Sequence, residues 1–287
     1  MVESLPCSES SLGTAEPAAG TAAEQRWWVF VEYRGAWSRK GFPQVNMPEA
    51  AHAVLSARQA DGFRVQLIRQ PQRCEAARRV YVLDGLRGLA WQADLDSLEN
   101  LSVLPWDAIK AGGALSLRTD APAFFVCTHG RRDVCCARLG VGVYHALSAA
   151  GDPEQVWQTT HLGGHRFAAT LLAAPQGICY GRATADDAAE IVAAHRGDRA
   201  ALLDRWRGRC AWPRPAQAAE VALRREVPGA ALGEIALDGV EAVDGGWTVR
   251  LSLGGAARMV PVAVVDLPPV VKSCGLEPSA LTGLRAG

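Results

Sequence analysis

The sequence predicts an α/β protein that ends in a mixed α+β segment. Short apolar runs with the composition of buried strands alternate along the chain with longer segments of helical composition. Turn-forming residues, such as Asp84-Gly85 and Pro175-Gln176-Gly177, separate these runs. The length of 287 residues and the hydrophobic content of 49% are sufficient for a sizeable core and for more than one domain.

The first part of the chain predicts a lead-in followed by an N-terminal α/β lobe. Residues 1–24 are rich in Ser, Ala, Glu and Gly, and this composition predicts a flexible segment. The lobe is expected over residues 25–115, with a connector near its end that carries a short helical piece. Its strands are predicted at 27–33, 63–68, 79–83 and 88–95, and its helix at 48–61.

A second unit is expected over residues 116–197, and an α+β extension over 198–287. No internal repeat stands out in the sequence. The elements of the second unit are predicted at 123–126 (strand), 133–150 (helix), 155–160, 167–174 and 177–183 (strands) and 185–195 (helix). Those of the extension are predicted at 198–207 and 215–226 (helices) and near 247–253 and 258–265 (strands).

Charge and cysteine usage restrict the function classes. The 30 basic and 30 acidic residues cancel, so no overall field attracts nucleic acid or an anionic membrane. The sequence has no run of 18 or more apolar residues and no signal-peptide pattern at its start. Its eight cysteines are too scattered for a disulfide framework. We therefore expect a cytoplasmic protein with no nucleic-acid or membrane partner.

Four residues in the second unit have the character of metal ligands. Cys127 ends a predicted strand, and Cys136 lies in the first turn of a helix that Asp133 can cap. The helix N-terminus stabilises a thiolate at that position. His161 and His165 follow in the pentapeptide His-Leu-Gly-Gly-His. Two thiols and two imidazoles suit either a zinc ion or an iron–sulfur cluster.

Five neighbouring residues are candidates for supporting roles. Gly163 and Gly164 leave room for the backbone to approach a bulky inorganic group. His129 could donate a hydrogen bond or relay a proton, or it could be a satisfied loop histidine. Cys135 and Cys136 point about 100° apart on a helix, so they cannot face the same metal equally, and the residues alone leave open which of them is the second cysteine ligand. Arg166 could tune a redox potential or dock an acidic partner, or it could be a solvated loop charge.

Segments 127–137, 161–168 and 180–182 resemble the sucrase/ferredoxin-like family, within the thioredoxin-like [2Fe–2S] ferredoxins. The resemblance implies a thioredoxin-like fold for residues 116–197 and a [2Fe–2S] cluster on Cys127, Cys136, His161 and His165. It also implies electron transfer with a redox protein partner, either a reductase or an acceptor enzyme. Imidazole ligands would raise the potential and make it depend on pH.

Two other readings remain open at the sequence level. The same donors could hold a structural zinc ion in a binding module. A thiol redox enzyme could use Cys135 with Cys136 or Cys127, although the chain lacks a Cys-x-x-Cys motif there. The sequence shows no convincing pair of acid and base carboxylates for glycoside hydrolysis, so we find no sucrase site. We expect an electron carrier with no catalytic residues of its own.

Overall fold

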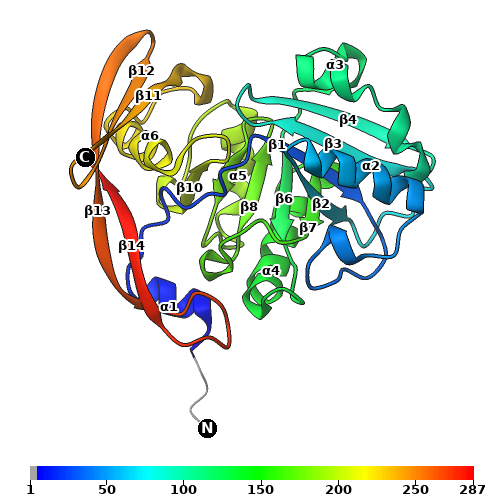
Figure 1. Ribbon diagram of the computed structural model, residues 1–287, viewed down its shortest axis with the longest axis horizontal. Coiled ribbons are helices and arrows are strands. Elements are labelled where there is room, and N and C mark those ends of the chain that lie inside the picture. Colours follow the sequence, from blue (N-terminus) through cyan, green and yellow to red (C-terminus); the bar gives the residue numbers. More distant parts are fainter. Residues whose placement is uncertain (1–4) are drawn as a thin grey trace.

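The computed structural model describes residues 5–287 and contains two β-sheets with helices packed against them (Figure 1). The strands are β1 (Trp27–Glu32), β2 (Phe63–Arg69), β3 (Arg78–Asp84), β4 (Leu89–Leu95), β5 (Arg118–Thr119), β6 (Ala123–Cys127), β7 (Val156–Thr159), β8 (Leu171–Ala174), β9 (Ile178–Tyr180), β10 (Trp206–Arg209), β11 (Ile235–Val243), β12 (Gly246–Leu253), β13 (Ala256–Val270) and β14 (Ser279–Ala286). The α-helices are α1 (Cys7–Gly13), α2 (Glu49–Ala60), α3 (Trp106–Ala111), α4 (Val134–Ala150), α5 (Ala188–Arg196) and α6 (Arg214–Glu226).

The larger sheet has ten strands and is built from two halves of the same topology. Its strand order is β10-β9-β8-β6-β7-β2-β1-β3-β4-β5. In each half a parallel pair joined by a helix is followed by an antiparallel pair, first β1-α2-β2 with β3-β4 and then β6-α4-β7 with β8-β9. The halves meet where β2 pairs antiparallel with β7, and β5 and β10 lie at the two edges. The strand order therefore contains an internal repeat that the sequence does not reveal.

The sheet curls strongly, so that strands from the two halves face each other. Phe30 on β1 and Phe125 on β6 stack with their ring centroids 3.7 Å apart, although β7 and β2 separate their strands in the sheet. Trp28 and Trp157 belong to the same buried cluster. This aromatic core fixes the position of the first half relative to the second.

Helices cover the convex faces of the two halves, on the other side of the sheet from this aromatic core. Leu55 of α2 and Ile109 of α3 pack with buried residues of the first half. Tyr144 of α4 and Ile191 of α5 pack with buried residues of the second half. These helices exclude water from both outer faces, so the strands in the middle of the sheet are buried on both sides.

The described part of the N-terminal segment, residues 5–24, differs from the flexible lead-in that its composition predicts. Residues 7–13 form helix α1, and Cys7 is fully buried. Further along, the backbone N–H of Gly20 donates to the carbonyl of Arg207 beside the edge strand β10. These tertiary contacts give order to a segment whose own composition favours little structure. Residues 1–4 lie outside the described range.

Most of the predicted elements are confirmed, but the helix expected at 198–207 is wrong. The chain there forms a short 3-10 turn, Leu203–Arg205, and then strand β10, which pairs antiparallel with β9. Trp206 is fully buried, and Arg209 pairs with the buried carboxylate of Glu220 at 2.9 Å. These long-range contacts override the helical composition of the segment. The sequence also did not predict β11 or β14.

The smaller sheet has the strand order β11-β12-β13-β14 and is antiparallel throughout. Its inner face packs on α6, where Ala219 and Leu223 meet Val249 and Leu251. Figure 1 shows that β13 and β14 extend away from β11 and β12 toward α1. Among the described residues, no helix has the length and apolar character that crossing a bilayer requires.

Candidate metal centre

Three elements of the second half bring the predicted donors to one edge of the large sheet. β6 and β7 are parallel neighbours, so their carboxyl ends lie at the same edge. Cys127 is the last residue of β6, and His161 follows two residues after the end of β7. α4 begins at this edge, where the side chain of Asp133 accepts a hydrogen bond from the backbone N–H of Cys135 and caps the helix as predicted. Cys136 therefore lies in the first turn, above the strand ends.

The side chains of Cys127, Cys136 and His161 form a compact donor group. His161 Nδ1 lies 3.9 Å from the Sγ of Cys127 and 3.8 Å from the Sγ of Cys136. All three donor atoms lie within 4.8 Å of one another, and both thiols are buried. Cys135 is not part of this group, because its side chain leaves the helix in another direction.

His165 lies beside this group but outside it. Its ring centroid is 5.0 Å from that of His161. Its Nε2 lies 2.8 Å from the carbonyl oxygen of Lys272 and donates to it, which leaves the Nδ1 without its proton. Nδ1 is buried and has no hydrogen-bond partner among the described residues. A buried acceptor with no partner is costly, so this nitrogen is suited to binding a metal.

The two buried thiols have pKa values shifted in opposite directions. A hydrogen bond from the thiol of Cys136 is the main reason why the pKa of Cys127 lies well below its ordinary value, and His161 adds to this effect. The same hydrogen bond, followed by burial, raises the pKa of Cys136. The site therefore favours one thiolate that is stabilised by its neighbour, which is a suitable starting state for binding a metal cation.

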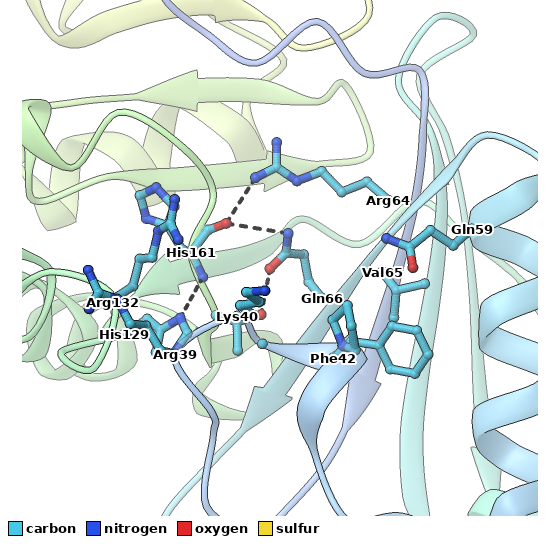
Figure 2. A pocket seen from close by; sticks show the side chains of 13 residues that line it. Arg39, Lys40, Phe42, Gln59, Arg64, Val65, Gln66, His129, Arg132 and His161 are labelled. Atoms are coloured by element: carbon cyan, nitrogen blue, oxygen red, sulfur yellow. Dashed lines mark hydrogen bonds between the residues drawn. The ribbon is translucent and has the colours of Figure 1, made fainter.

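The backbone of His161 is fixed by three side chains (Figure 2). Its carbonyl oxygen accepts from Arg64 Nη2 at 2.9 Å and from Gln66 Nε2 at 3.4 Å. Its N–H donates to His129 Nδ1 at 3.3 Å, while His129 Nε2 donates to the carbonyl of Ser38 at 2.8 Å. Burial is the main cause that lowers the pKa of His129. His129 therefore acts as a neutral ring that positions the histidine loop.

The two glycines of the histidine loop are required by their backbone conformation and, at Gly164, by the close approach of Arg207. Gly163 and Gly164 have φ values of +101° and +69°, which other residues rarely adopt. A Cβ on Gly164 would collide with the guanidinium of Arg207, whose Nη1 donates to the carbonyl of Gly163 at 2.8 Å. Arg207 is buried, and burial lowers its pKa to about 10. The residue that approaches the loop in the structure is therefore Arg207.

Arg166 does not point at the thiols. Its Nε donates to both carboxylate oxygens of the buried Glu16, at 2.9 and 3.0 Å. The guanidinium groups of Arg166, Arg182 and Arg207 all lie over the ring of Phe167, between 4.6 and 5.2 Å from its centroid. This cluster ties the N-terminal segment to the histidine loop.

A basic cleft of about 420 Å³ opens beside His161 (Figure 2). Its lining contains no carboxylate, and its outer wall carries the exposed side chains of Arg39, Lys40 and Arg132. Arg64 and His161, which are both half-buried, also line the cleft. The cleft gives a chain with no net charge one local surface that favours anions.

Little in the sequence indicates which residues support the donors. Arg64 and Gln66 lie on β2 of the first half, almost a hundred positions from His161. They reach the histidine loop only because β2 pairs with β7. Arg207 lies in the segment 198–207, for which the sequence predicts a helix. The alternation of charged and apolar residues in Arg64-Val65-Gln66-Leu67 was the one available signal, because it places both polar side chains on the same face of a strand.

The fold and these donors define an α/β protein with a candidate metal site made of thiols and imidazoles. The sequence profile of the sucrase/ferredoxin-like family matches residues 18–208, a range that includes almost all of the ten-stranded sheet. The chain belongs to the sucrase/ferredoxin-like family. Neither a search of curated proteins nor a search of solved structures found a significant match.

Proposed function

We propose that this protein is an electron carrier with a [2Fe–2S] cluster bound by Cys127, Cys136, His161 and His165. The observation that carries the proposal is the donor set at the sheet edge. Two buried thiols lie beside His161 Nδ1. The ring of His165 lies 5.0 Å from that of His161, centroid to centroid, and its Nδ1 has no hydrogen-bond partner among the described residues. Two thiols and two imidazoles are a known ligand set for a two-iron cluster, which supplies one-electron transfer when bound.

The topology of the second half supports a thioredoxin-like unit over residues 116–197. Its strands lie in the order β7-β6-β8-β9, with β6 and β7 parallel and the other two pairs antiparallel. α4 connects the parallel strands, and α5 follows the hairpin. In this arrangement the ligands come from the end of the first strand, the start of its helix and the loop after the second strand.

The surrounding residues would hold the donors in place. Arg64, Gln66 and His129 fix the backbone of His161, so its ring needs little reorganisation to bind a metal. The Lys272 carbonyl selects the tautomer of His165 that leaves Nδ1 free. Imidazole ligands would also couple the potential to pH, since each ring keeps a second nitrogen.

The basic cleft supports a redox partner with an acidic surface. Arg39, Lys40 and Arg132 surround an opening that leads to His161. An acidic reductase or acceptor enzyme docked there would approach the donor group along a short path and would be attracted by complementary charge. We place this exchange in the cytoplasm, and all eight cysteines are free, as that compartment requires.

A structural zinc ion is the second candidate for the same donors. Cys127, Cys136 and His161 offer three donor atoms within 4.8 Å of one another, which is close enough for a single ion. Such a site would hold the loop and the helix together without redox chemistry.

Absorption and low-temperature EPR spectra of protein purified without oxygen test the proposal, before and after addition of dithionite. We expect visible charge-transfer bands and a rhombic reduced signal whose average g lies below that of all-cysteine ferredoxins. Iron and sulfide should be present in equal amounts. A colourless, EPR-silent protein that loses bound zinc when Cys127 is replaced by Ser would favour the zinc candidate instead.

A further inference from the structure

A second group of metal-binding side chains lies on the other side of the first turn of α4. It consists of Cys7, Asp133, Cys135 and Cys274, whose donor atoms all lie within 4.8 Å of one another. The Sγ–Sγ distances are 3.6 Å for Cys7–Cys135, 3.3 Å for Cys135–Cys274 and 3.6 Å for Cys274–Cys7. The two carboxylate oxygens of Asp133 are 3.6 and 3.8 Å from the Sγ of Cys7.

This spacing is close to that of a tetrahedral metal site. A zinc ion with Zn–S bonds of about 2.3 Å holds its sulfur ligands about 3.8 Å apart. The observed triangle of sulfur atoms is within a few tenths of an ångström of that value on two of its three edges. A disulfide needs sulfur atoms about 2 Å apart and could use only two of the three thiols.

The surroundings of this group are those of a buried anionic site. Cys7 and Cys135 are fully buried, and Asp133 is 5% exposed. The Ser8 hydroxyl donates to the Sγ of Cys135 at 3.3 Å, and the N–H of Cys7 to the Sγ of Cys274 at 3.5 Å. Such hydrogen bonds stabilise thiolate ligands.

Cationic side chains do not balance this group. Among residues 5–287, the salt bridges of Asp133 include only His165, at 3.7 Å, and no Arg or Lys. Hydrogen bonds from the N–H groups of Cys135 and Cys274 and from the Ser273 hydroxyl stabilise the carboxylate of Asp133, but they do not neutralise the negative charge that the carboxylate and any thiolates beside it would carry. A divalent metal ion would neutralise that charge.

We propose that Cys7, Cys135, Cys274 and Asp133 bind one structural zinc ion, separate from the Cys127, Cys136 and His161 group. Three thiolates and one carboxylate complete four-coordinate zinc, with no open position for a substrate. On binding, the three thiols release three protons to solvent, and no electron is transferred. Four donors this close together suit a single ion and leave no room for a two-iron cluster.

The proposed ion would connect three distant parts of the chain. Cys7 begins α1, Cys135 lies in α4, and Cys274 lies in the loop between β13 and β14. Figure 1 shows α1 beside the ends of β13 and β14. Cys7 and Cys274 both lie outside the part of the chain that matches the family. The zinc ion would therefore clamp both terminal segments onto the family fold.

The clamp would also act on the first site through His165. The carbonyl of Lys272, which accepts from His165 Nε2, is two residues before Cys274. The backbone N–H of Cys274 and the hydroxyl of Ser273 both donate to Asp133 Oδ2, at 2.9 and 3.1 Å. Fixing Cys274 therefore fixes the partner that sets the tautomer of His165.

Elemental analysis of the full chain and of cysteine variants tests this site. We expect about one zinc ion per chain in the wild type and at least a roughly tenfold loss in Cys7→Ser and in Cys274→Ser. Cys74→Ser is the matched control, because Cys74 is exposed and belongs to neither group. Cys127→Ser should lose the metal of the first site and keep this zinc ion, which separates failure of this proposal from failure of the proposed function.

Native alkylation of the wild type tests the site without any variant that must fold. Iodoacetamide followed by mass spectrometry should label Cys74 at once and label Cys274 only after a zinc chelator is added. The proposal is overturned if zinc is absent from the wild type or persists in the Cys7→Ser/Cys274→Ser double variant. It is also overturned if iron occupies these residues, or if mass spectrometry finds a disulfide between any two of the three cysteines.

Discussion

Individual residues of the first half position the histidine loop of the second half. The carbonyl of His161 accepts from Arg64 and Gln66 of β2, and His129 holds its N–H. The identity of the donors is local information, since Cys127 and Cys136 stand at a strand end and a helix start. Their support is long-range information, because it depends on how the two halves pair. A sequence reading therefore finds the donors more easily than the residues that hold them.

Replacing His161 by Cys should lower the midpoint potential of the proposed cluster, by on the order of 100 mV, because a thiolate adds negative charge where an imidazole is neutral. Redox titration followed by visible absorption would measure the shift. His145→Cys is the control, since His145 is exposed on α4 and outside the donor group. An unchanged potential in His161→Cys would count against ligation by this residue.

Replacing Gly164 by Ala should lower the free energy of unfolding by about 1–3 kcal/mol, because Gly164 has a φ of +69° and an added Cβ collides with Arg207. Urea unfolding would measure the change. Gly142→Ala is the matched control, because Gly142 lies in α4 with open space around an added Cβ and should be stabilised slightly. Equal effects at the two positions would show that the loop tolerates a side chain.

At the scale of secondary structure, helix α5 contains a buried histidine that should make stability depend on pH. Burial, with a smaller contribution from Arg209, lowers the pKa of His195 from 6.5 to about 4. The folded state therefore resists protonation, and stability is lost as pH falls from about 6.5 toward 4. The expected loss between pH 8 and pH 5 is about 2 kcal/mol.

His195→Gln isolates this effect, because an amide can still bond to the Tyr180 hydroxyl, which lies 2.9 Å from His195 Nε2, but does not titrate in this range. The measurement is the difference between urea unfolding free energies at pH 8 and pH 5 in wild type and variant. This difference should be smaller in the variant by about 2 kcal/mol. The same pH dependence in both proteins would assign the loss to other groups.

Elements with a strong local pattern were predictable, and elements fixed by their neighbours were not. The apolar run at Ala123–Val126 and the Asp133 cap mark β6 and the start of α4. The segment before Trp206 has helical composition, yet its end forms β10 because β9 offers an edge and Glu220 offers a buried partner for Arg209. The ordered segment at residues 5–24 likewise depends on contacts with β10 and β13.

At the scale of the whole molecule, a formal charge of zero conceals an uneven surface. The basic cleft beside His161 should attract anions, so reduced protein should lose electrons faster to ferricyanide than its net charge suggests. Arg39→Glu/Lys40→Glu should slow this reaction about 3- to 10-fold at low ionic strength, with less effect at high salt. Stopped-flow absorption would give the rates.

Hexaamminecobalt(III), a cationic oxidant, should show the opposite trend with the same double variant. Arg250→Glu/Arg258→Glu is the control with the same charge change, since both arginines are exposed on the smaller sheet. If both variants change the two rates equally, electrons leave by another surface and the cleft is not the docking site.

The two halves of the large sheet repeat one topology, so their first strands, β1 and β6, occupy equivalent positions. The end of β6 carries Cys127, whereas the end of β1 carries Glu32, which is fully buried and pairs with Arg34 at 2.7 Å and Arg73 at 3.2 Å. The second half thus has a candidate metal donor at the position where the first half has a buried carboxylate paired with two arginines. Without the first half, β7 would be an edge strand with unpaired backbone N–H and C=O groups. The first half therefore gives β7 a permanent neighbour and covers an edge at which a strand of another chain could otherwise pair.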